Sequence, residues 1–130
     1  MRSQSGFNIY WILSILLMGL IFLFSSFPPP MELPSFPFAD KLIHLLAYGL
    51  LASLIYFARG KSQSIFHSIF IPFLIVFLYG VSDEIHQHFV PGREADVFDA
   101  LADALGAFAF PLGIHVKKYG RAKKFPNKNR

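Results

Sequence analysis

The chain has 130 residues, of which 54% are hydrophobic and 15% charged, with 16 phenylalanines and a net charge of +4. This composition does not fit a soluble domain of this size; it indicates an integral membrane protein with a single domain. The cations gather in the C-terminal segment without interleaved stacking aromatics, which argues against nucleic-acid binding. The absence of cysteine excludes disulfides, thiolate chemistry and cysteine-ligated zinc.

Two apolar segments in the first half of the chain predict helices. Residues 7–24 carry no charge and are long enough to span a membrane. A cleaved signal peptide is the alternative, but the run exceeds the usual ~7–15 apolar residues. Residues 25–38 are so rich in proline that they predict an extended polyproline segment. Residues 40–58 predict the second helix, with Asp40 as its N-cap residue.

Two further helices are predicted in the second half. Residues 65–88 form the third, which Pro72 should kink or divide into an interfacial turn and a spanning part. Residues 96–115 form the fourth, after a turn at Pro91-Gly92. It is the least apolar, so we expect it inside the bundle, packed through a small-residue strip of Ala102, Gly106, Ala109 and Gly113. Residues 116–130 form a basic tail that we expect to be disordered.

The charges predict an orientation. If the four helices alternate in direction, Arg2, Arg59, Lys61 and the basic tail lie on one side of the membrane. The positive-inside rule makes that side cytoplasmic, so both termini are predicted to be cytoplasmic. Lys41 and Arg93 lie on the opposite side. All the acids fall on that outer side or in the outer halves of helices: Glu32, Asp40, Asp83, Glu84, Glu94, Asp96, Asp99 and Asp103.

Three of the predicted helices carry a polar stripe at helical spacing. The stripes are Asp40, His44 and Tyr48 on the second helix, Asp83, Glu84 and Gln87 beside Gly80 on the third, and Asp96, Asp99 and Asp103 on the fourth. Counted inward from the outer ends of the helices, the stripes reach similar depths. One outward-opening cavity could therefore hold all of them.

Two interpretations of these stripes remain open. In one, the residues form a buried polar network that holds the helices together, with Lys41 and Arg93 as the partners of the carboxylates. In the other, they form a site, because the carboxylates outnumber the local cations and some must be protonated, hydrated or bound to a cation. Arg93 could also present its guanidinium group to a phosphate or carboxylate ligand.

Other chemistry is less well supported by the sequence. A metal on His44, Asp83, Asp99 and Asp103, with His86 and His88 nearby, is a minor alternative, since the spacing matches no standard zinc motif. Ser82 neighbours Asp83 but lacks a nucleophile elbow or a lysine partner. We interpret His86 and His88 as residues of the aqueous boundary, and His67 and His115 as interfacial residues toward the cytoplasmic side.

The motifs resemble those of the VanZ-like family of small bacterial membrane proteins. The resemblance covers roughly residues 40–113. It is carried by Asp40-Lys41-x-x-His44-x-x-x-Tyr48-Gly49, by Ser82-Asp83-Glu84-x-x-Gln87, and by Pro91-Gly92-Arg93 followed by Asp96, Asp99, Asp103 and Gly106. Many relatives carry Asn at the position of Asp103, so this chain adds an ionisable group there.

The resemblance implies a single VanZ-like transmembrane domain over residues 1–115, a cytoplasmic tail over 116–130, and a role in the bacterial cell envelope. The family's namesake is associated with low-level teicoplanin resistance. We therefore expect a multi-pass protein of the cytoplasmic membrane that binds or modifies a lipid-linked or peptidoglycan-related molecule. Its partners would be membrane lipid and such a precursor, or a lipoglycopeptide, with no predicted cofactor and an open oligomeric state.

In this interpretation Asp83, Glu84 and Asp99 are acid/base or ligand-binding groups, His44 relays a proton or binds ligand, and Arg93 anchors an anion. The remaining candidates would contact substrate: Asp40, Lys41, Tyr48, Gln87, Asp96 and Asp103. The competing hypothesis is a non-enzymatic interaction protein whose polar cluster only holds the helices together. A proton- or cation-coupled transporter is a third, disfavoured because the acids all lie on one side.

Overall fold

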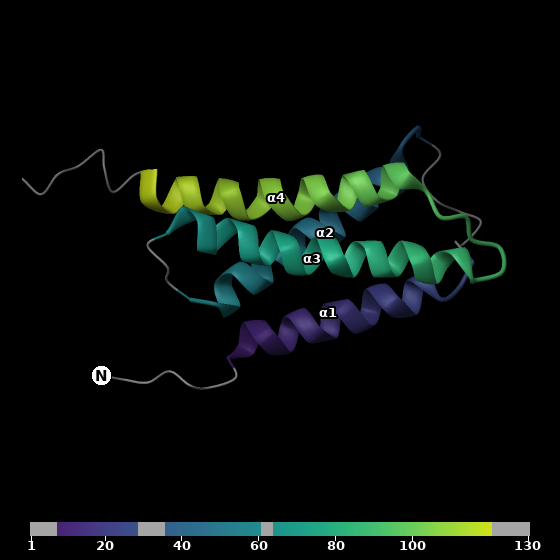
Figure 1. Cartoon of the computed structure of the whole chain (residues 1–130), viewed down its shortest axis with the longest axis horizontal. Coiled ribbons are helices and arrows are strands. Elements are labelled where there is room, and N and C mark those ends of the chain that lie inside the picture. The colour runs from purple at the N-terminus through teal and green to yellow at the C-terminus, as the bar shows by residue number, and fades with distance from the viewer. Residues whose placement is uncertain (1–7, 29–35, 61–63, 121–130) are drawn as a thin grey trace, which may run out of the picture.

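The computed structural model describes residues 8–28, 36–60 and 64–120, and these form four helices with short connections. The helices are α1 (Ile9–Ser25), α2 (Ala39–Ala58), α3 (Ile65–His88) and α4 (Val97–Gly120). They lie alongside one another, with the α1–α2 and α3–α4 connections at one end, here called the outer end, and the starts of α1 and α3 and the end of α4 at the other (Figure 1). The prediction of an all-helical fold is confirmed for the described residues.

The predicted helix bounds agree closely with the structure except at the end of α4. This helix continues five residues beyond 115, to Gly120, so that Lys117 and Lys118 are helical and do not belong to a disordered tail. Cations suit a helix C-terminus, where they offset the negative end of the helix dipole. The rest of the predicted basic tail and most of the predicted polyproline segment lie outside the described residues.

Side-chain caps explain where three of the helices begin. Asn8, Ser64 and Asp96 precede α1, α3 and α4, and each accepts hydrogen bonds from backbone N–H groups two or three residues further on. The prediction that Asp40 caps α2 was wrong. That helix begins after Phe38, which has a positive φ of 66° and makes no side-chain cap, and Asp40 lies inside the first turn.

Helix α2 contributes most of the fully buried apolar core: Tyr48, Leu51, Ala52 and Ile55, joined by Val76 of α3 and Ala107 of α4. Helices α2 and α3 each pack against all three other helices, whereas α1 and α4 do not contact each other. Helix α4, which was expected to lie within the bundle, packs against α2 and α3. Helix α4 is itself long and apolar enough to cross a membrane.

The contact between α2 and α4 depends on Gly106 more than on a continuous strip. A Cβ atom at Gly106 would collide with the backbone carbonyl oxygen of Leu45 and would lie 3.1 Å from the backbone nitrogen of Gly49. Of the other predicted strip residues, Ala102 is half-buried, and Ala109 and Gly113 are exposed. The buried face of α4 instead consists of Asp99, Asp103, Gly106, Ala107, Pro111 and His115.

Both helical prolines face inward. Pro72 and Pro111 are fully buried, and α3 and α4 continue through them as unbroken helices. Pro72 therefore does not divide the third helix into two segments.

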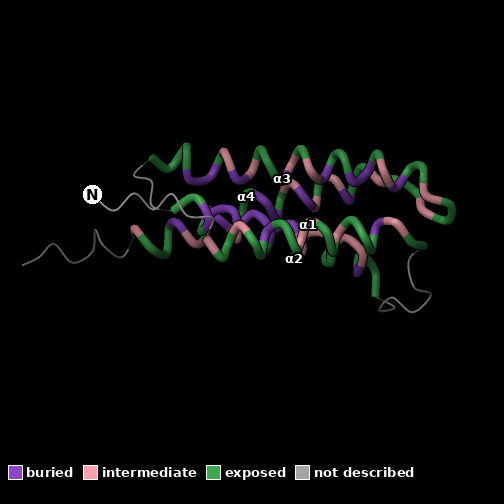
Figure 2. The backbone as a smooth tube through the Cα atoms, turned by 90° about the horizontal axis from the view of Figure 1, so that it is seen from below, coloured by how far each residue is buried: buried purple, intermediate pink, exposed green. Residues whose placement is uncertain are grey.

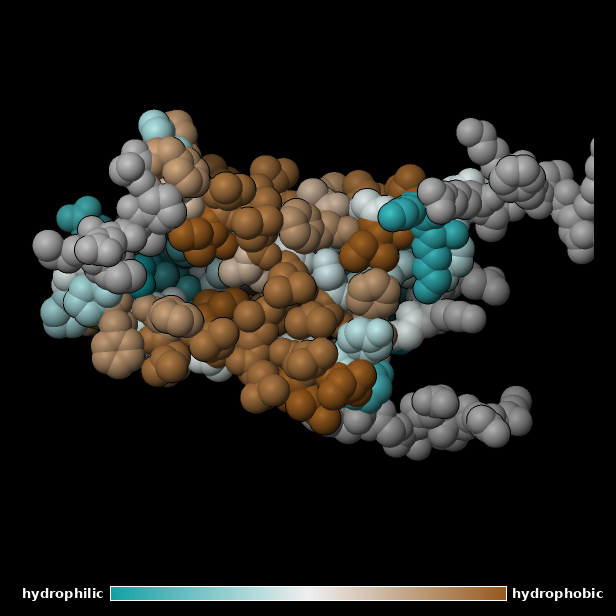
Figure 3. Space-filling view, turned by 180° about the vertical axis from the view of Figure 1, so that it is seen from behind, coloured by the Kyte–Doolittle hydropathy of each residue, from teal (hydrophilic) through white to brown (hydrophobic). Residues whose placement is uncertain are grey.

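The outward faces of the helices are strongly apolar. Residues on these faces are exposed along the length of the bundle (Figure 2), and the visible face is covered by a broad apolar band with polar groups toward both ends (Figure 3). Helices α2, α3 and α4 are long and apolar enough to cross a membrane, while α1 is apolar but has only 17 residues. An apolar exterior around a partly polar interior is typical of a membrane-embedded protein.

Candidate functional site

Lys41 joins three carboxylates at the outer end of the bundle. Its Nζ atom lies 2.7 Å from Asp40, 2.6 Å from Asp96 and 2.8 Å from Asp99. The lysine is on α2, whereas Asp96 precedes α4 and Asp99 lies in its first turn, so the cluster ties these two helices together. Asp96 lies outside the helices, and its hydrogen bonds from Lys41 and from the Phe98 N–H hold its pKa below the usual range.

His44 stands one turn deeper on α2 and faces α4 with both ring nitrogens. Nδ1 lies 2.9 Å from Oδ1 of Asp103, and Nε2 lies 3.6 Å from Oδ2 of Asp99. The imidazole is also parallel to the ring of Tyr48, with centroids 6.0 Å apart. The position and tilt of the histidine are therefore fixed from three directions.

Asp83 lies at the junction of α1, α2 and α3. Its Oδ2 atom accepts hydrogen bonds from the Ser25 hydroxyl at 2.8 Å, the Tyr48 hydroxyl at 2.9 Å and the Gln87 amide at 3.1 Å. The Gln87 amide also donates to Ser25 at 3.3 Å. All four side chains are buried, so one carboxylate oxygen is held by three uncharged donors away from solvent.

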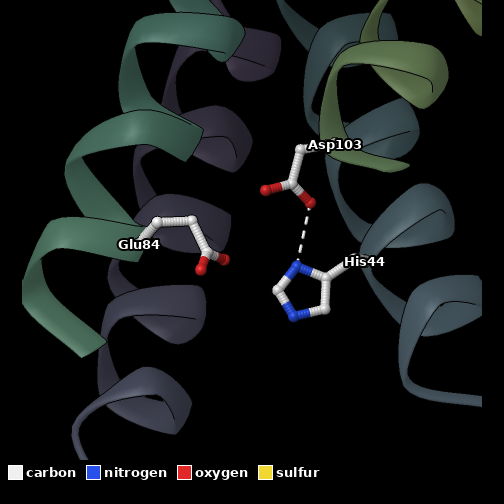
Figure 4. Close-up of side chains that lie close together, drawn as sticks. All are labelled: His44, Glu84 and Asp103. Atoms are coloured by element: carbon white, nitrogen blue, oxygen red, sulfur yellow. Dashed lines mark hydrogen bonds and ion pairs between the residues drawn. The ribbon is translucent and has the colours of Figure 1, made fainter. Parts of the chain in front are cut away.

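Glu84, the next residue along α3, faces α4. Its Oε2 atom accepts the backbone N–H of Asp96 at 3.1 Å. Its carboxylate lies across from Asp103 and beside the imidazole of His44 (Figure 4). One ligand atom from each of these three residues lies within 4.8 Å of the other two, which makes them the set that could hold a metal ion. The metal alternative drawn from the sequence included Asp83 and Asp99 and omitted Glu84.

The sequence led us to expect ion pairs between Arg93 and the carboxylates, but Arg93 makes none with the carboxylates of the described residues. Its Nε donates to the backbone carbonyl of Phe27 at 2.7 Å and one Nη donates to that of Phe24 at 2.8 Å. These carbonyls lie at and just beyond the C-terminal end of α1, where the regular hydrogen bonds of the helix run out, and the Phe24 carbonyl also accepts the Phe27 N–H at 3.5 Å. Arg93 thus fastens the α3–α4 connection to the end of α1.

A cavity of about 360 Å³ lies between α1 and the polar cluster. Its apolar wall is made by Leu17, Leu20, Ile21, Phe24, Ile43 and Ala47. Its polar wall is made by Ser25, Asp40, His44, Tyr48, Asp83, Gln87 and Arg93. Glu84, Asp96, Asp99 and Asp103 do not line this cavity, and His44, which does, contacts Asp99 and Asp103.

Sequence reasoning missed the contribution of α1. Ser25 was assigned to a proline-rich loop, yet it ends α1, is buried and donates to Asp83. The adjacent Ser26 contacts Nε2 of His86 at 3.0 Å. The pair of serines that closes an otherwise apolar run was the available signal.

The structure also locates three histidines and one serine that the sequence analysis kept apart from the cluster. His115 is buried, and its Nδ1 lies 3.1 Å from the Tyr56 hydroxyl. His86 is half-buried against Phe22 of α1, whereas His88 is exposed. Ser82 is exposed and donates to the carbonyl of Tyr79, so it is not directed toward the cluster.

The fold and the cluster define a helical membrane-type protein whose carboxylates, lysine and histidine are packed between its helices. The chain belongs to the VanZ/LLP1 family, whose model matches residues 10–117 and so includes nearly the whole of all four helices. The family resemblance predicted from the motifs is confirmed. No curated protein and no solved structure matches the chain.

Proposed function

We propose that this protein resides in the bacterial cytoplasmic membrane and binds or modifies a lipid-linked or peptidoglycan-related molecule of the cell envelope. The observation that carries the proposal is the cavity beside α1, because it has apolar and polar walls. Its volume of about 360 Å³ falls within the range of about 300–1,000 Å³ that is usual for ligand sites. A lipid chain fits the α1 side, and a polar head group fits the side formed by Tyr48, Asp83 and Gln87.

The proposed arrangement has four membrane-spanning helices with both termini in the cytoplasm. The starts of α1 and α3 and the end of α4 share one end of the bundle (Figure 1), and the carboxylates bound to Lys41 lie toward the other, near the start of α2 and the start of α4. Arg59, Lys117 and Lys118 belong to the first end, which the positive-inside rule assigns to the cytoplasm. The cavity then opens in the outer half of the membrane, where lipid-linked precursors and lipoglycopeptides meet.

Within this proposal the acidic residues act on, or hold, the polar part of the ligand. Asp83 and His44 line the cavity directly, while Glu84 and Asp99 stand behind His44 and would act through it. Arg93 lines the same cavity and remains a candidate anion anchor, although two of its nitrogens are bound to α1. In a sensitive host, occupation of the site would lower susceptibility to teicoplanin.

The test is teicoplanin susceptibility of a sensitive Gram-positive host expressing the native chain, Asp83→Asn or Asp99→Asn at equal membrane levels. Two further variants distinguish the effect of filling the cavity from the effect of adding a ring elsewhere on the protein. Ala47→Phe places a ring in the cavity, whereas Ala109→Phe adds the same ring to an exposed position of α4. We expect protection by the native chain and Ala109→Phe, and loss of protection with the other three. Equal protection by all five proteins would contradict the proposal.

The competing function is a non-enzymatic interaction protein whose polar cluster only fastens the helices. The ion pairs of Lys41 favour it, because they join α2 to the start of α4. In that case the Asp→Asn variants would lower yield and thermal stability in proportion to any loss of protection. A functional site predicts loss of protection in protein that still folds and accumulates normally.

A further inference from the structure

Six buried or half-buried carboxylates share the described outer part of the bundle with a single lysine, and their partners divide them into three groups. Asp40, Asp96 and Asp99 share the Lys41 ammonium group. Asp83 is held by uncharged donors. Glu84 and Asp103 remain, and neither contacts a lysine or arginine in the described part of the chain. Like Asp83, these two have no lysine or arginine partner among the described residues, but unlike Asp83 they share the space beside the imidazole of His44.

Glu84 and Asp103 each keep one buried oxygen without a hydrogen-bond partner among the described residues. The atoms are Oε1 of Glu84 and Oδ2 of Asp103. Glu84 is 9% exposed and Asp103 is 1% exposed, so water does not readily reach these oxygens. The two carboxylates face the same space, with the imidazole of His44 beside them (Figure 4). An unpartnered buried carboxylate oxygen is costly unless a cation or a proton satisfies it.

We propose that His44, Glu84 and Asp103 form a binding site for one divalent transition-metal cation, with Zn²⁺, Mn²⁺ and Co²⁺ as the class of ion it takes. Two ionised carboxylates and a neutral imidazole carry two negative charges in total, which one divalent cation balances. The nitrogen ligand favours transition metals over Mg²⁺ and Ca²⁺, which prefer oxygen ligands alone. Three protein ligands leave a further coordination position, as in catalytic rather than structural metal sites.

Binding would require the three side chains to move closer together. In a tetrahedral site, metal–ligand bonds of about 2.0–2.2 Å place neighbouring ligands about 3.3–3.6 Å apart. The present ligand atoms lie within 4.8 Å of one another, and they come from three different helices, α2, α3 and α4. Loss of the proton shared between Nδ1 of His44 and Oδ1 of Asp103, now 2.9 Å apart, would free both atoms for the ion.

The surroundings resemble the outer shell of a metal site. Nε2 of His44 faces Oδ2 of Asp99, and a carboxylate behind a ligating histidine fixes its tautomer and orientation. The second oxygen of Glu84 is held by the backbone N–H of Asp96. The ligands are thus oriented by groups that would not themselves bind the ion. This proposal does not depend on the lipid-binding function, because metal affinity is measured without any lipid ligand.

The test uses the full-length chain, purified in detergent, stripped of metal with a chelator and titrated with Co²⁺. We expect one equivalent to bind with visible absorption bands, and Mn²⁺ to compete. Glu84→Gln, Asp103→Asn and His44→Ala should each weaken Co²⁺ binding by at least about tenfold, given that even outer-shell changes cost about 10–100-fold. Glu94→Gln removes an exposed acid at the same end of the bundle and should leave affinity unchanged.

Three results would overturn the site. One is the absence of saturable Co²⁺ binding, and another is binding that the ligand variants leave unaltered. The third is measured on the native chain and so applies even if the variants do not fold. Pulsed electron paramagnetic resonance of bound Mn²⁺ should detect coupling to a histidine nitrogen, and the absence of that coupling would refute the proposed ligands. Failure of the teicoplanin experiment would leave these measurements untouched, so the two proposals fail separately.

Discussion

At the level of single residues, the hydrogen bonds to Asp83 join three helices at one buried atom. Three donors from α1, α2 and α3 meet one carboxylate oxygen, and the other oxygen has no hydrogen-bond partner among the described residues. The Asp83 carboxylate therefore already lacks some of its hydrogen bonds, and removing one of the three donors would leave this buried group with fewer still. The Tyr48 hydroxyl is the donor that can be removed with the smallest change of shape.

We expect Tyr48→Phe to lower the free energy of unfolding by about 1–2 kcal/mol, above the average of about 0.6 kcal/mol for interhelical hydrogen bonds in a membrane protein. Tyr79→Phe is the matched control. The Tyr79 hydroxyl donates to the carbonyl of Met18, which lies in the interior of α1, where its backbone has a helical partner. Reversible unfolding in mixed micelles measures the free energy of unfolding of both variants. Equal losses would show that the hydrogen bond from Tyr48 to Asp83 contributes no more than the control hydrogen bond.

At the level of helices, the closest approach lies between α2 and α4 at Gly106. We expect Gly106→Ala to destabilise the protein by about 1–3 kcal/mol, because the added methyl group meets backbone atoms of Leu45 and Gly49 that cannot rotate away. Gly113→Ala on the same helix meets nothing within 4 Å and should be neutral or stabilising by up to about 1 kcal/mol. Thermal unfolding of the two variants compares them directly, and a stable Gly106→Ala protein would mean that the helices are further apart.

The helices themselves could be predicted from sequence because their signals are local. Long apolar runs separated by proline, glycine and charge define the four segments, and the small capping residues Asn8, Ser64 and Asp96 mark three of the starts. The rotation of α4 was less predictable. Small residues lie on more than one of its faces, and which face turns inward is decided by the contact of Gly106 with α2, a tertiary contact with no local signal.

The polar stripes on α2, α3 and α4 could also be predicted, because helical spacing alone places their residues on shared faces. Their partners could not. Lys41 and Arg93 look equivalent in sequence, but the structure directs the lysine to carboxylates and the arginine to the carbonyls that end α1. Likewise Glu84 and Asp83 are adjacent, yet a rotation of about 100° per residue points one at α4 and the other at α1.

At the level of the whole molecule, the two ends of the bundle differ in charge. The carboxylate cluster and its lysine lie at the end formed by the α1–α2 and α3–α4 connections. Arg59, Lys117 and Lys118 belong to the other end, where the guanidinium group of Arg59 donates to the carbonyl of His67. Since cytoplasmic segments of membrane proteins are enriched in lysine and arginine, the bundle should insert with this second end inside.

The absence of cysteine makes this orientation directly measurable, because a single introduced thiol is the only one in the chain. Glu94→Cys and Lys118→Cys place that thiol at exposed positions at opposite ends of the bundle. We expect a membrane-impermeant maleimide to label Glu94→Cys in intact cells, and Lys118→Cys only after the membrane is opened. The reverse pattern would turn the cavity toward the cytoplasm and remove the basis for contact with lipoglycopeptides. The helix packing and the metal site would be unaffected, because neither depends on which side the cluster faces.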